Sequence, residues 1–118
     1  MGFPAEVMEP MTNFNFEYLY FADMDKEKLW QKIETASKND YIMACNISPD
    51  DNSRVAKSIG LVPGHVYTLV KGVECNIEGR QIRLLNIRNP WGVAKYSGPY
   101  CDQDNFWKNE DNVKAFQW

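Results

Sequence analysis

The single histidine of this 118-residue chain, His65, is the residue best suited to acid–base chemistry. It lies in the stretch GLVPGHVYTLV, where a glycine/proline turn gives way to an apolar, β-branched run. An imidazole can take the proton of a thiol or a hydroxyl, and it does so best when a further group holds its second nitrogen. A histidine beside glycine at the start of a strand is more often structural, so the chemical interpretation requires a partner.

Asn89, in the turn-forming stretch NPWG, becomes that partner if the intervening chain forms a β-hairpin. Two strand-like runs, VYTLVKGVEC (66–75) and RQIRLLNIR (80–88), flank the tetrapeptide NIEG (76–79), whose asparagine and glycine can adopt positive φ. In an antiparallel pair of strands, the residue numbers of any two facing residues add up to the same value. A reversal within this tetrapeptide makes that value 154 to 156. His65 and Asn89 sum to 154, so we expect them opposite each other or within a couple of positions.

An amide that faces an imidazole orients the ring without adding a negative charge. This suits a thiolate–imidazolium pair, the Cys-His-Asn arrangement of nucleophilic catalysis. The three cysteines are poor candidates for the thiol, because Cys45 lies in an apolar run, Cys75 beside a turn and Cys101 in a polar loop. Their odd number and the lack of C-x-x-C spacing disfavour a disulfide framework or a zinc site and favour a reducing, cytoplasmic compartment. A metal site would have to be built from carboxylates.

The remaining segments predict helical and extended elements around this hairpin. A helix is expected from Asp25, its candidate N-cap, to a stop at Lys38-Asn39, with one apolar face made by Leu29, Trp30, Ile33 and Ala36. The apolar run 41–47 predicts a short buried strand, and 53–60 predicts a loop with at most one helical turn. The segment after NPWG shows little periodicity. Residues 1–24 have no core of their own and are interpreted as a segment that lies against something else.

Composition excludes several classes of protein. A net charge of −3 at pH 7 leaves no basic footprint for nucleic acid, and no apolar run approaches the length of about eighteen residues that spans a membrane. The N-terminal stretch lacks the basic-then-apolar layout of a signal peptide. With 44% apolar residues the chain can bury a single core, as one small domain or as a piece of a larger one.

Several stretches together resemble a known family. GLVPGHVYTLV, IRLLNIRNPWG and YSGPYCD are similar, in order and in spacing, to the second half of the catalytic core of calpain-type cysteine proteases. LWQKIETASKNDYIMACNI is similar to the opening of that half, so the resemblance covers roughly residues 25 to 110. It implies an α+β, papain-like fold, of which this chain would be the right-hand subdomain: a twisted antiparallel sheet with one main flanking helix.

The resemblance also implies roles for single residues at the matching positions. His65 would be the general base, Asn89 the residue that orients it, and Trp91 a shield that keeps water from the pair. Residues 25–118 would form the His/Asn-bearing subdomain, ending before the family's final strand, and residues 1–24 would be a linker or extension from the preceding half of the protease. The implied partners are that nucleophile-bearing half and a polypeptide substrate in the cleft between the halves.

The chain departs from the family pattern at functional positions. The family's nucleophile stands in a G-x-C-W context, which none of the three cysteines has, so the chain by itself is expected to hydrolyse nothing. In calcium-dependent members, carboxylates of this half bind the ion. Asp102 matches one of these positions, but Lys95 occupies another where glutamate is usual, and a cation there opposes calcium. We therefore expect this chain to require no cofactor, whereas the intact enzyme could bind calcium.

The function predicted from the sequence is the His/Asn-bearing part of a cytoplasmic thiol endopeptidase. Two alternatives remain open. The chain could be a non-catalytic, calpain-like binding or regulatory module that keeps the fold, and an upstream Gly-x-Cys-Trp motif would distinguish this from the protease. It could also be a β-rich carbohydrate- or peptide-binding domain that uses the Trp and Tyr residues of its tail. In that case the facing of His65 and Asn89 would be accidental.

Overall fold

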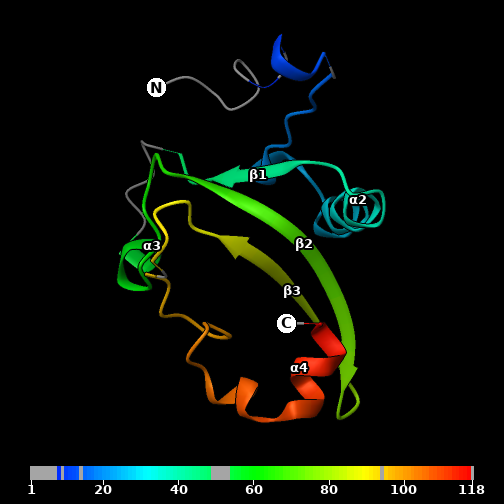
Figure 1. Cartoon of the computed structure of the whole chain (residues 1–118), viewed down its shortest axis with the longest axis vertical. Coiled ribbons are helices and arrows are strands. Elements are labelled where there is room, and N and C mark those ends of the chain that lie inside the picture. Colours follow the sequence, from blue (N-terminus) through cyan, green and yellow to red (C-terminus); the bar gives the residue numbers. More distant parts are fainter. Residues whose placement is uncertain (1–7, 9, 14, 49–53, 94, 118) are drawn as a thin grey trace.

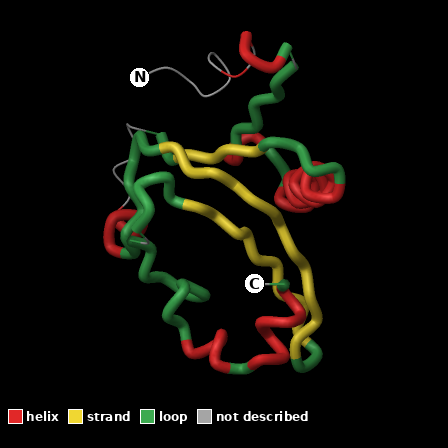
Figure 2. Tube along the Cα trace, viewed as in Figure 1, coloured by secondary structure: helices red, strands yellow, loops and turns green. Residues whose placement is uncertain are grey.

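A long β-hairpin organises the computed structural model of the chain, which describes residues 8, 10–13, 15–48, 54–93 and 95–117. β2 (Val66–Ile77) and β3 (Arg80–Arg88) form the hairpin, and β1 (Met43–Asn46) adds an antiparallel strand on the other side of β2. Figure 1 shows β2 as a long curved ribbon between two shorter neighbours. With helices around this antiparallel sheet, the fold is α+β, as the sequence predicts (Figure 2).

The hairpin reverses at a two-residue turn, Glu78-Gly79. Both residues have positive φ, 50° and 79°, the combination that a type I′ turn requires, and Ile77 pairs with Arg80 across it. The predicted reversal is thus confirmed, although Asn76 belongs to the strand and does not supply a positive φ. Because the turn is shorter than the predicted tetrapeptide, the position numbers of facing residues sum to 157 next to it.

A β-bulge lies between Leu69 and Lys71, where the register shifts. One extra residue in β2 lowers the sum to 156 toward the open end of the hairpin. Extended past the strand ends, this register sets Asn89 opposite Tyr67. His65 is therefore two positions away from directly facing Asn89, within the range expected from the sequence but not at the sum of 154.

Helix α2 (Lys26–Lys38) follows the pattern predicted for it. The Asp25 carboxylate accepts the backbone N–H of Lys28 at the first turn, which is the expected N-cap. Trp30 and Ile33 are the buried residues of the apolar face. Their burial against the sheet, more than helix propensity, stabilises a helix of this length.

The packing of α2 on β2 depends on Gly72. A Cβ at this position would lie 2.8 Å from Cγ2 of Ile33, so the missing side chain allows helix and strand to approach closely. The Gly72 N–H donates to Oγ of Ser37 at 2.9 Å. β1 does not extend this far along β2, so the helix supplies a hydrogen-bond acceptor where no neighbouring strand does.

Two predictions for the shorter elements need correction. The run 41–47 forms only the four-residue strand β1, whose residues alternate between half-buried and exposed because it is an edge strand with one covered face. The ambiguous run 53–60 contains a short helix, α3 (Arg54–Ser58), with Ala56 buried; residue 53 lies outside the described residues.

The tail after NPWG contains structure that its weak periodicity did not predict. η2 (Asn105–Lys108) and α4 (Glu110–Phe116) bring Phe116, which is 0% exposed, into ring contact with Phe106 and Trp107. The ammonium of Lys71 donates to the Gln117 carbonyl at 3.0 Å and thus ties the end of α4 to β2. These packed rings are not laid out as an exposed binding surface, which weighs against the carbohydrate-binding alternative.

The N-terminal segment extends away from the sheet in Figure 1. It contains a short 3-10 helix, η1 (Phe21–Asp23), and contacts α2 through an exposed ion pair between Glu17 and Lys32 at 2.6 Å. Its role as a linker from a preceding protease half stays a prediction. Across the described parts of the chain, every helix is too short or too polar to traverse a lipid bilayer.

Candidate functional site

His65 is held at the end of a tight turn, immediately before β2. Gly64 adopts φ +72°, a conformation that favours glycine, and its N–H donates to the Ile47 carbonyl at 2.9 Å. The His65 N–H donates to the Val62 carbonyl at 3.3 Å, and the Val62 N–H donates to the Tyr67 hydroxyl at 3.0 Å. The backbone that carries the imidazole is therefore fixed to both β1 and β2.

Asn89 is placed by the NPWG turn that follows β3. The Gly92 N–H donates to the Asn89 carbonyl at 3.1 Å, and Gly92 has φ +75°. The side chain of Asn89 folds back over the same turn, where its Oδ1 accepts the backbone N–H of Trp91 at 3.1 Å. This hydrogen bond to the residue two positions on is an Asx turn, a common reason for asparagine at the start of a turn.

The two side chains meet in a hydrogen bond of 2.8 Å between Nε2 of His65 and Oδ1 of Asn89. A backbone N–H can only donate, so the hydrogen bond from Trp91 identifies the amide atom at this point as oxygen rather than nitrogen. An amide oxygen can only accept, so the proton of a neutral His65 ring lies on Nε2. Nδ1 then keeps its lone pair and can accept a proton.

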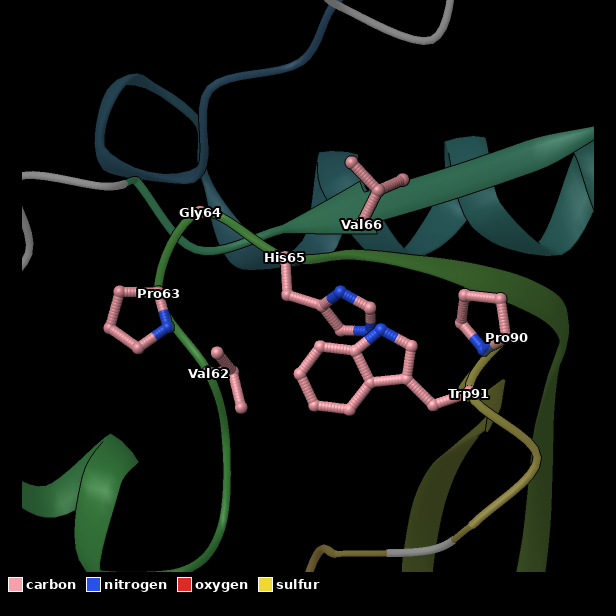
Figure 3. A pocket seen from close by; sticks show the side chains of 7 residues that line it. All are labelled: Val62, Pro63, Gly64, His65, Val66, Pro90 and Trp91. Atoms are coloured by element: carbon pink, nitrogen blue, oxygen red, sulfur yellow. The ribbon is translucent and has the colours of Figure 1, made fainter. Parts of the chain in front are cut away.

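Trp91 covers one face of this pair. The centroids of the indole and the imidazole are 4.1 Å apart, with the planes tilted by 36°, and the edge of Tyr67 approaches the imidazole at 4.6 Å. Figure 3 shows the two rings lying one against the other, with Val62 and Pro63 across from them. His65 and Asn89 are half-buried, so their hydrogen bond is partly shielded from water.

An open cavity of about 480 Å³ adjoins the imidazole. Its lining is apolar apart from the His65 ring and the backbone, and consists of Val62, Pro63, Gly64, His65, Val66, Pro90 and Trp91. A proton-accepting imidazole at the wall of an apolar, solvent-connected cavity can perform acid–base chemistry on a bound molecule.

The structure brings together His65, Asn89 and Trp91, but it does not add a thiol to them. All three cysteines are free and half-buried, and none lines the cavity beside His65. Burial raises the pKa of the Cys45 thiol, which disfavours the reactive thiolate, and the Cys75 thiol donates to the Ala115 carbonyl at 3.1 Å. These surroundings agree with the expectation that the thiols of Cys45 and Cys75 are inert, and the expectation for Cys101 stays a prediction.

Among the described residues, Asp102 is the candidate calcium ligand that the sequence indicates. Nowhere in those residues do three His, Cys, Asp or Glu side chains gather closely enough to hold a metal. Asp102 is exposed, and the nearby Asp104 carboxylate is already engaged by the N–H groups of Phe106 and Tyr100, which lower its pKa. Asp102 as a calcium ligand therefore stays a prediction without a partner, and we assign no step to the ion.

Two contacts of the site were not predicted from the sequence. The contact of Tyr67 with the imidazole could have been predicted, because residues 65 and 67 of an extended segment point to the same face. The sequence carries no such signal for Lys95, because this residue lies in an irregular loop. Its ammonium reaches the indole of Trp91 and lies 4.7 Å from the ring centroid.

Comparison with known proteins identifies the family. The family model for calpain family cysteine proteases matches residues 1–116. Calpain-9 of Mus musculus is 30% identical over 112 residues, which cover 93% of this chain and 16% of that protein. Calpain-A of Drosophila melanogaster is 32% identical over 114 residues, covering 91% of this chain and 14% of that protein, and Calpain-8 of Rattus norvegicus is 32% identical over 111 residues, covering 91% and 16%. This chain spans about one sixth of the length of these relatives, and it belongs to the calpain family of cysteine proteases.

Proposed function

We propose that His65 is the general base, and Asn89 its orienting residue, for peptide-bond hydrolysis in a cysteine endopeptidase of which this chain forms part. The observation that carries the proposal is the 2.8 Å hydrogen bond from Nε2 of His65 to Oδ1 of Asn89, with the Trp91 N–H fixing the orientation of the amide. This arrangement leaves Nδ1 as the proton acceptor, which is what a thiol nucleophile requires of its base.

The chemistry follows from this tautomer. A cysteine supplied by the preceding half of the protease transfers its proton to Nδ1, and the thiolate attacks the scissile carbonyl carbon. The imidazolium then returns the proton to the leaving amine as the carbon–nitrogen bond breaks, which yields an acyl-enzyme. Water, deprotonated by the same imidazole, hydrolyses the acyl-enzyme and restores the thiol.

Asn89 and Trp91 serve the imidazole in different ways. The amide oxygen accepts a hydrogen bond from Nε2–H of both the neutral ring and the imidazolium. It therefore holds the ring in place throughout the cycle without supplying a charge. The indole reduces the access of water to that hydrogen bond, which strengthens it in its lower-dielectric surroundings. The polypeptide substrate would lie along the apolar cavity beside His65, between the two halves of the protease.

The free state of Cys45, Cys75 and Cys101 supports a reducing, cytoplasmic location. The burial of the Cys45 thiol and the hydrogen bond of the Cys75 thiol also support the proposal that the chain alone is inactive. Peptidase activity of the purified chain, abolished by alkylation of its thiols, would contradict that inactivity.

The decisive assay mixes this chain with the preceding half of its own protein, or uses the full-length protein, and follows cleavage of an unfolded polypeptide. His65→Ala should lower kcat by about 10²- to 10⁴-fold, the usual contribution of a general base. Asn89→Ala should lower kcat by a smaller factor, and Asn76→Ala, an exposed asparagine of β2, serves as the matched control. If a folded His65→Ala protein keeps full activity, His65 is not the general base. If the wild-type protein shows no activity, the chain is a binding module rather than part of a protease.

A further inference from the structure

We infer that Lys95 is a positioning residue whose ammonium holds the Trp91 indole against His65. Nζ of Lys95 lies 4.7 Å from the centroid of the indole ring, and that ring lies 4.1 Å from the imidazole centroid. The three side chains thus form a series in which a cation contacts the ring that contacts the base. The chemical consequence of this series rests on the proposed role of His65.

The indole needs such support because Trp91 is 51% exposed. Hydrophobic burial therefore acts on only part of the ring, and its tilt of 36° to the imidazole is not the geometry of a tightly stacked pair. An ammonium over the face of a tryptophan is the strongest of the cation–π contacts with aromatic side chains. At an exposed site it favours the contacted conformation by about two- to fivefold.

Lys95 is placed for this contact by its backbone. The Lys95 carbonyl packs directly on Gly60: a Cβ at Gly60 would lie 1.8 Å from that oxygen. Two residues further on, the Ser97 N–H donates to the Ile59 carbonyl at 2.9 Å. The turn at 59–60 leads within five residues to His65, so one short segment of chain fixes both the base and the backbone of the lysine.

The charge of Lys95 is available to the indole. Within the described ranges, the ion pairs formed by lysine or arginine are Lys32–Glu17, Lys38–Glu34, Arg83–Glu27 and Arg83–Glu74, and none of them involves Lys95. A lysine without a carboxylate partner can turn its ammonium to an aromatic face while its methylene stem covers neighbouring apolar surface. Lys95 therefore acts on Trp91 through the charge of its ammonium and not through a salt bridge.

The test uses NMR on the 118-residue chain, in which the single histidine gives unambiguous imidazole signals. Stacking on an indole displaces the His65 ring-proton shifts upfield, and Trp91→Ala supplies the unstacked reference. Lys95→Met keeps the methylene stem and removes the charge. Its His65 ring-proton shifts, measured over a temperature series, should move toward those of Trp91→Ala. The expected size is a two- to fivefold fall in the ratio of stacked to unstacked ring. Lys95→Arg should restore the wild-type shifts, because guanidinium also binds aromatic faces.

The matched control is Lys26→Met, an exposed lysine at the start of α2, which should leave the shifts unchanged. Wild-type shifts in Lys95→Met would overturn the inference, as would a Lys95→Arg variant that behaves like Lys95→Met. Shifts that do not respond to Trp91→Ala would also overturn it, since the rings would not be in contact. Because these readouts do not use peptidase activity, failure of the inference is distinct from failure of the catalytic role of His65.

Discussion

Replacing Asn89 with alanine should weaken the preference of the neutral His65 ring for the tautomer that carries its proton on Nε2. In the structure Oδ1 of Asn89 accepts the Nε2 proton at 2.8 Å, and no other tautomer of the neutral ring can donate there. The Nε2–H tautomer loses the free energy of one neutral hydrogen bond, about 0.5–1.5 kcal/mol. This corresponds to a two- to twelvefold fall in the ratio of the Nε2–H to the Nδ1–H tautomer.

The same substitution also removes the acceptor for the Trp91 N–H. Trp91 is 51% exposed, so water can take over this donor and the backbone change adds little to the effect on His65. Asn89→Asp is a second control, because its carboxylate retains an acceptor for both donors. We expect this variant to keep both the turn and the Nε2–H tautomer.

Long-range proton–nitrogen NMR correlations of the imidazole give the tautomer ratio directly from the shifts of Nδ1 and Nε2. The measurement is made on the neutral ring, with Asn76→Ala as the control and the amide signals of β2 and β3 as a check on folding. A folded Asn89→Ala chain with the wild-type ratio would refute the orienting role. A shifted ratio in Asn89→Asp, which retains the acceptor, would likewise count against the acceptor as the group that sets the tautomer.

Three further outcomes concern stability. Gly72→Ala should destabilise the chain by about 1–3 kcal/mol in urea unfolding, because its Cβ would lie 2.8 Å from Cγ2 of Ile33 in a packed core. Gly60→Ala should cost more than Gly72→Ala, since the new Cβ meets the backbone oxygen of Lys95 at 1.8 Å and φ is +80°; equal losses would contradict the close approach. Asp104→Asn should be less stable than wild type at neutral pH, because two backbone N–H groups lower the carboxyl pKa in the folded state. That stabilisation is fully present above the unfolded Asp pKa of about 3.9 and is lost as pH falls through the lower folded value, so the two unfolding curves should converge in acid.

The elements predicted correctly are those with a local physical signal. Asp25 caps α2, the apolar spacing of Trp30 and Ile33 marks its buried face, and glycine permits the reversal at Glu78-Gly79. Each of these signals acts within a few residues of the chain. The proximity of His65 and Asn89 followed from the same local information, because a hairpin with a known turn brings its two ends together.

The elements that were missed depend on contacts between distant segments. α4 has seven residues, too few to show a clear helical period, and it is held by Phe116 against rings of η2 and by the Lys71 contact to its C-terminal end. β1 is half-exposed because α2 and β2 leave it at the edge of the sheet, which its apolar sequence does not reveal. In both cases tertiary packing overrides what the segment alone predicts.

The bulge in β2 decides how the site is assembled. Without it, the register of 157 near the turn would continue to the open end of the hairpin and move the chain beyond β3 by one position relative to His65. A one-residue slip turns side chains to the other face of a sheet, so the side chain of Asn89, the first residue after β3, would then turn away from the imidazole. With the bulge, the register of 156 continues to the last pair, Thr68 and Arg88, and the NPWG turn that starts at the next residue carries Asn89 and Trp91 to the imidazole. The imidazole therefore has an indole against its face and an amide at its edge because of one extra residue four to five positions along the strand.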